Sequence, residues 1–131
     1  MAEKGFVAGT ILVTNQKGES FFLVHSQDGK LSFLYERMEQ DTKFPMGTIM
    51  RSLLTHIHAD SEALRIMDTT NIRSEELNVP LFVFDLTLRP EDPNELLVEG
   101  SPVAWRRAKE LEKLLKEFNF SGVPVYRSET F

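Results

Sequence analysis

The sequence predicts an α+β fold, with a β-sheet, an amphipathic mid-chain helix and a C-terminal helix. Two observations support this class. The first third of the chain consists of short apolar runs separated by turn residues, a pattern typical of strands. After Gly47 the apolar residues recur at a spacing of about 3.6, which is the period of a helix. At 131 residues the chain is expected to form a single domain, residues 1–131.

The predicted strands lie mainly before residue 38. Residues 6–14 are rich in Val, Ile and Thr, and residues 20–25 form a short apolar run. The pair Asp28-Gly29 is a strong turn signal, and apolar and polar residues alternate over residues 31–37. These three runs predict a meander. Residues 79–88 are apolar on both faces and are expected to form a central strand, and residues 95–98 to form a short one.

The mid-chain helix is predicted from an apolar stripe between Gly47 and Ile57. Asp60 or Ser61 is suited to cap a second helical turn that runs through Met67, because a short oxygen side chain can accept a free N–H group. The pattern leaves open whether residues 48–68 form one kinked helix or two short ones.

The C-terminal helix is predicted over residues 101–118. Ser101 is a suitable N-cap and Pro102 suits the first helical position. Apolar residues from Ala104 to Phe118 then repeat at alternating steps of four and three. Residues 123–126 are expected to form an edge strand or a packed tail.

Composition limits the possible functions. The chain has no cysteine, which excludes disulfides and thiolate sites and is consistent with the cytoplasm. No apolar run approaches the roughly 18 residues that would span a bilayer, so no membrane partner is expected. A net charge of -5 disfavours a broad surface for nucleic acid.

The order of strands, a Pro-x-Gly turn, a helix, a strand and a helix resembles the Nudix hydrolase family over roughly residues 8–118. The resemblance implies an α/β/α sandwich with a mixed sheet. The motif of that family, G-x5-E-x7-R-E-U-x-E-E-x-G-U with U apolar, holds divalent ions through paired glutamates. With its first Gly placed on Gly47, Leu53 takes the place of the first Glu, and Arg65 and Ile66 take the places of the pair. Sliding the later part restores only Asp68.

The resemblance therefore implies a degenerate motif with no catalytic residue, metal or cofactor. Magnesium needs a local concentration of carboxylates, and an arginine in place of a ligand repels the ion. We expect a small ligand, phosphorylated or nucleotide-like, or a regulatory role, in a cleft between the sheet and the Gly47 helix. The candidate ligand-binding residues are Phe44, Arg51, Glu62 and Arg65, since guanidinium groups suit phosphate. Arg51, Glu62 and Arg65 could equally be surface residues.

Two alternatives remain open. A divergent hydrolase of nucleoside diphosphate derivatives would need Mg or Mn and acids from elsewhere, and the available donors are Glu36, Glu39, Asp41 and Asp85. An interaction protein that acts through homodimerisation is the other alternative.

A second motif overlaps the mid-chain helix. Residues 53–60, LLTHIHAD, are similar to the H-x-H-x-D-H motif with which the metallo-β-lactamase family holds zinc. Ser61 stands in place of the last histidine, and only His25 lies outside the motif. On a helix, His56 and His58 would point to different sides, so we expect one half-buried and one exposed histidine and no zinc site.

Overall fold

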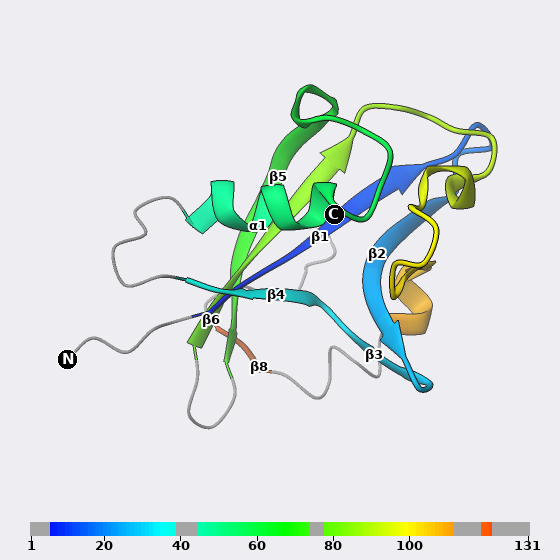
Figure 1. Ribbon diagram of the computed structural model, residues 1–131. Coiled ribbons are helices and arrows are strands. Elements are labelled where there is room, and N and C mark those ends of the chain that lie inside the picture. The colour runs from blue at the N-terminus through cyan, green and yellow to red at the C-terminus, as the bar shows by residue number, and fades with distance from the viewer. Residues whose placement is uncertain (1–5, 39–44, 74–77, 112–118, 122–131) are drawn as a thin grey trace.

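The computed structural model describes residues 6–38, 45–73, 78–111 and 119–121, and all structural statements below concern these residues. The described elements are eight strands, one α-helix and three short 3₁₀ turns (Figure 1). The strands are β1 (Phe6–Thr14), β2 (Ser20–Gln27), β3 (Lys30–Ser32), β4 (Leu34–Arg37), β5 (Leu64–Arg73), β6 (Asn78–Leu86), β7 (Val103–Arg106) and β8 (Asn119–Ser121). The helix is α1 (Pro45–Leu54), and the 3₁₀ turns are η1 (Ser61–Ala63), η2 (Pro93–Leu96) and η3 (Ala108–Leu111).

All eight strands belong to one mixed sheet in which β1 is central. One edge of β1 pairs with β6 in parallel, and β6 pairs with β5 and β5 with β8, both antiparallel. The other edge of β1 is shared: its first half pairs with β4 and its second half with β2. Strand β2 then leaves β1 and pairs with β3 and β7. The mixed sheet implied by the sequence is therefore confirmed.

The predicted N-terminal strands are present. Asp28 and Gly29 have φ values of 53° and 76°, as a two-residue hairpin turn requires. The predicted meander is wrong in its last step, because the run over residues 31–37 is divided between β3 and β4. Strand β3 continues the hairpin with β2, whereas β4 returns to pair with β1.

The mid-chain helix is shorter than predicted. It begins at Pro45 and ends at Leu54, so Gly47 lies in its first turn. Asp60 does cap the next turn by accepting from the Glu62 N–H, but that turn is η1. The second helical segment is wrong, because the chain continues as strand β5 from Leu64. Residues of β5 such as Thr69 and Thr70 favour the extended conformation, and this preference outweighs the helical spacing.

The predicted C-terminal helix is wrong at its start. Residues 103–106 form β7, which adds to the free edge of β2. Val103 and Trp105 are both buried on the same side of this strand, a period of two that the longer stripe concealed. Within the rest of the predicted helix, Ala108–Leu111 form the 3₁₀ turn η3. Residues 112–118 and the predicted tail, residues 123–126, lie outside the described residues. Residues 93–96 form η2, so the strand predicted at 95–98 is also wrong.

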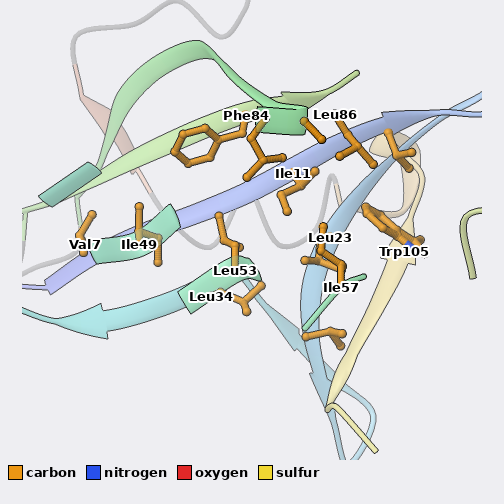
Figure 2. Close-up of a cluster of buried hydrophobic side chains, with 14 residues drawn as sticks. Val7, Ile11, Leu23, Leu34, Ile49, Leu53, Ile57, Phe84, Leu86 and Trp105 are labelled. Carbon is orange, nitrogen blue, oxygen red and sulfur yellow. The ribbon is translucent and has the colours of Figure 1, made fainter. Parts of the chain in front are cut away.

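The sheet separates two apolar cores. The larger core lies between the sheet and α1 (Figure 2), and it contains Val7, Ile11, Val13, Leu23, Leu34, Ile49, Leu53, Ile57, Ala63, Leu64, Phe84, Leu86, Val103 and Trp105. The smaller core lies on the opposite face and includes Ala8, Val24, Phe33, Val79, Leu81 and Leu111. In the part of the chain that the structure describes, no helix is long and apolar enough to cross a membrane.

Candidate functional site

Two hydrogen-bonded pairs of polar side chains lie near the C-terminal end of α1, and His25 lies near enough to His56 to affect its pKa. We call them the polar cluster: His25 on β2, Glu36 on β4, Ser52 on α1, His56 in the loop after α1, and Ser101 before β7. The cluster borders the larger core, and its side chains are half-buried except for the exposed Glu36.

The alternation of the strands places the two strand residues of the cluster on the α1 side of the sheet. His25 lies two residues after Leu23 and is the cross-strand partner of Val103, and both of these side chains belong to the larger core. Glu36 lies two residues after Leu34, which is also in that core. The sheet therefore presents an imidazole and a carboxylate on the face covered by the helix.

Two hydrogen bonds join four members of the cluster into two separate pairs. The Ser52 hydroxyl donates to Glu36 Oε2 at 2.8 Å, which ties α1 to β4. His56 Nδ1 lies 3.1 Å from Ser101 Oγ, and the tautomer of the imidazole decides which of the two donates. These contacts leave the second carboxylate oxygen of Glu36 and Nε2 of His56 available to a ligand.

Burial lowers the pKa of His56 below its usual 6.5, because the interior disfavours the charged imidazolium. The neighbouring His25 lowers this pKa further, whereas the Glu36 carboxylate acts in the opposite direction. His56 is therefore uncharged at neutral pH. An uncharged imidazole can both accept and donate a hydrogen bond, and it can accept a proton.

The loop that carries His56 is held by backbone hydrogen bonds. The Val98 N–H donates to the His56 carbonyl at 2.9 Å, and the His58 N–H donates to the Leu96 carbonyl at 2.7 Å. Ile57, between the two histidines, is buried and forms a bridge with Leu97. The predicted half-buried and exposed histidines are confirmed, as His56 and His58 respectively, although the segment is a loop and not a helix.

The structure does not bring the predicted ligand-binding residues together. Arg51 is exposed on α1, and Glu62 is exposed in η1. Arg65 is the cross-strand partner of Asp85, which alternates with the core residues Phe84 and Leu86, so Arg65 lies on the opposite face of the sheet from α1. Phe44 lies outside the described residues. Ligand binding by these four residues stays a prediction.

The space between α1 and β1 is filled by side chains. A Cβ atom added at Gly9 would lie 2.6 Å from Ile49 Cγ1, so the helix touches the strand backbone there. Figure 2 shows Ile49 and Leu53 pointing from α1 toward the sheet. At Gly9 the described side chains leave no room for a ligand between α1 and β1, so we take the polar cluster at the end of the helix as the candidate site.

The divalent ion that the Nudix resemblance implies does not fit the described side chains. The ten residues of α1, PMGTIMRSLL, contain no carboxylate. Among the described residues, no three His, Asp or Glu side chains are grouped so that they could hold a metal. Of the acids considered for a divergent hydrolase, Glu36 lies in the cluster and Asp85 on the opposite face. Glu39 and Asp41 lie outside the described residues.

The sequence reading missed most of the cluster. His25, Ser52 and Ser101 come from three distant segments, and no local motif links them. One signal in the sequence could have indicated the cluster. His25 lies two residues after the apolar Leu23, so on a strand both side chains are expected on the same, core-facing side.

The mixed sheet with α1 on one face is a Nudix-like fold, and comparison with solved structures supports this assignment. No family model matches the sequence, and no curated protein matches it. The structure of an Ap4A hydrolase from C. elegans matches with a TM-score of 0.60 at 12% identity, covering 88% of each chain. The Nudix hydrolase RenU from M. smegmatis matches with a TM-score of 0.58 at 10% identity, covering 88% of this chain and 75% of RenU.

A third similar structure is the C-terminal domain of mouse MUTYH, solved in complex with human PCNA. Its TM-score is 0.54 at 12% identity, and the match covers 84% of this chain and 77% of that domain. Because identities are this low, all three comparisons establish the fold alone.

Proposed function

We propose that this chain is a Nudix-like domain that binds a small polar molecule at the polar cluster and does not carry out the metal-dependent hydrolysis of the Nudix family. One observation carries the proposal. Helix α1 carries Gly47, on which the resemblance places the start of the family motif, and α1 contains no carboxylate, whereas a half-buried set of hydrogen-bonding side chains lies at its C-terminal end.

The cluster suits a ligand with several hydrogen-bonding groups. The hydroxyls of Ser52 and Ser101 and the uncharged His56 can each donate and accept, and Glu36 accepts. Arg51 directly precedes Ser52 on α1 and is exposed, so its guanidinium is a candidate partner for an anionic group. These features support the expected phosphorylated or nucleotide-like ligand.

A divergent hydrolase is the second candidate. Its support is that His56, whose pKa is lowered by burial, lies near enough to the Glu36 carboxylate for that group to affect its pKa, and an uncharged imidazole can act as a general base. Two of the similar structures are described as hydrolases, one of Ap4A. In this alternative Glu36 is the acid that the cluster supplies.

The test is to incubate the protein with Ap4A and a panel of nucleoside diphosphate derivatives, with Mg or Mn, and to record both the thermal midpoint and the products. We expect at least one compound to raise the midpoint without being cleaved. The variants His56→Asn and Ser101→Ala should reduce this rise, and Arg65→Ala on the opposite face should not.

Cleavage that EDTA abolishes and Glu36→Gln removes would favour the hydrolase instead. If no compound raises the midpoint or is cleaved, a small nucleotide-like ligand is excluded.

A further inference from the structure

Part of the outer edge of β5 has no strand partner among the described residues. Its inner edge pairs with β6 from Leu64 to Arg73, but its outer edge pairs with β8 only from Asn71 to Arg73 within the described parts of the chain. Ile66 and Met67 lie in the remaining stretch and are 48% and 50% exposed. The Thr69 N–H in this stretch donates to Asp68 Oδ1. A strand edge with exposed apolar side chains favours pairing with another strand.

A β-bulge divides this stretch. The pairing of β5 with β6 shifts between Ile66, opposite Phe84, and Asp68, opposite Val83, so Met67 is the extra residue. In a regular strand Arg65 and Asp68 would lie on opposite faces because they are three residues apart. Here their partners are Asp85 and Val83, which share one face of β6. The bulge therefore places Arg65 and Asp68 on the same face of the sheet.

We propose that β5 pairs with β5 of a second copy of this chain, antiparallel and about a two-fold axis between Ile66 and Met67. In this register Arg65 lies opposite Asp68 of the second copy, and the symmetry forms the same pair twice. Ile66 lies opposite Met67 of the second copy, also twice. The exposed apolar side chains are thereby covered, and two pairs of opposite charge flank them.

The faces of the strand residues are compatible with this register. Residues directly opposite each other in an antiparallel pair must lie on the same face. Leu64 and Thr69 share the α1 face through their partners Leu86 and Phe82, and Arg65 and Asp68 share the other face. Shifting the register by one residue would place Ile66 opposite Asp68, which lies on the other face. The pairing of Arg65 with Asp68 is what distinguishes the proposed register from larger shifts.

The stretch is short, so the proposed dimer belongs to the small and weak class of interfaces and forms reversibly. Sedimentation velocity from low micromolar to several hundred micromolar protein should show the mass rising from 15.0 kDa toward twice that value. A protein that remains a monomer throughout this range would overturn the proposal.

Charge reversal tests the register. Arg65→Asp places two acids opposite each other, and Asp68→Arg places two guanidinium groups opposite each other, so each single variant should remain monomeric. The double variant Arg65→Asp/Asp68→Arg restores both pairs and should dimerise as the original chain does. Arg89→Glu, an exposed charge reversal in the loop after β6, is the matched control and should dimerise normally. Dimerisation of both single variants, or no recovery in the double variant, would contradict this register.

Cross-linking gives an independent measurement because the chain has no cysteine of its own. Oxidising an equimolar mixture of Ile66→Cys and Met67→Cys should give mostly the mixed disulfide dimer. Directly opposed strand residues lie about 4.5–5.5 Å apart at Cα, within the range of a disulfide. A predominance of the two self-linked products would show a different register.

Discussion

Gly9 illustrates how one residue sets the position of the helix. Without a side chain there, α1 lies directly on β1, and an added Cβ would be 2.6 Å from Ile49 Cγ1 and 3.1 Å from Leu53 Cδ1. We predict that Gly9→Ala lowers the free energy of unfolding by about 1–3 kcal/mol, because the interior is overpacked. Urea unfolding followed by the fluorescence of the single tryptophan measures this change.

The Ile49→Ala variant is the control for this prediction. It removes the atom that the new methyl group would meet, so Gly9→Ala should cost less in this background than in the original chain. Equal costs in the two backgrounds would show that the steric explanation is wrong.

His56 makes the stability of the folded protein depend on pH. Its pKa in the folded protein lies below the usual 6.5, so the unfolded chain binds the proton more tightly. The stability contribution of the uncharged imidazole is therefore complete above pH 6.5 and is lost as the pH falls below that value. We expect His56→Asn to reduce the loss of stability between pH 7 and about pH 5, measured by urea unfolding.

Imidazole NMR titrations distinguish the causes of this shift. His25→Asn should raise the pKa of His56, because the electrostatic effect of His25 is removed, and Glu36→Gln should lower it. Changes in the reverse directions would contradict the geometry of the polar cluster.

At the scale of elements, α1 has one buried and one exposed side. Leu53 is fully buried in the larger core, and Leu53→Ala should lower the free energy of unfolding by about 2–5 kcal/mol. Arg51 lies two residues earlier and is exposed, so Arg51→Ala should change it by no more than about 0.5 kcal/mol. Similar effects of the two substitutions in urea unfolding would mean that the helix is rotated.

A substitution at Trp105 tests the position of strand β7. Its indole Nε1–H donates to the Pro93 carbonyl at 2.9 Å and is buried, which connects β7 to η2. We predict that Trp105→Phe lowers the free energy of unfolding by about 1–3 kcal/mol, because the carbonyl loses its partner. Urea unfolding of this variant should be followed by circular dichroism, because the variant has no tryptophan whose fluorescence could be recorded. A neutral effect would indicate that the indole N–H is not paired.

The sequence predicted some strands correctly and mistook others for helix, because only some of the strands have a local pattern of their own. Strands β1, β2 and β6 were predicted because their apolar runs are short and bounded by turn residues. Strands β5 and β7 were mistaken for helix because a spacing of three and four residues also occurs by chance in a strand with a bulge or a mixed face. Pairing with β6 and β2, which no local window contains, decides their conformation.

The site was harder to predict than the fold. The absence of carboxylates in α1 is visible in the sequence, but the sequence analysis placed the candidate ligand site in a cleft between the sheet and this helix and not at its C-terminal end. The polar cluster itself depends on the split of β1 between β2 and β4, which places His25 and Glu36 on either side of the same helix end. That topology follows from long-range pairing and not from residue spacing.

At the scale of the whole molecule, the protein should not depend on divalent ions for its stability. An ion that binds the folded chain raises the thermal midpoint by mass action. Because α1 carries no acid, we predict the same midpoint with excess Mg, with excess Mn and with EDTA, recorded by scanning calorimetry. A midpoint that rises with Mn concentration would show a binding site and would contradict the proposed mode of action.

The parallel pairing of β1 has a consequence for translation of the chain. Its neighbour β6 ends at Leu86, long after β1 has been synthesised. The edge of β1 that pairs with β6 therefore stays open until residues 78–86 have been added. During that interval the nascent chain is a natural client for chaperones that hold exposed apolar segments.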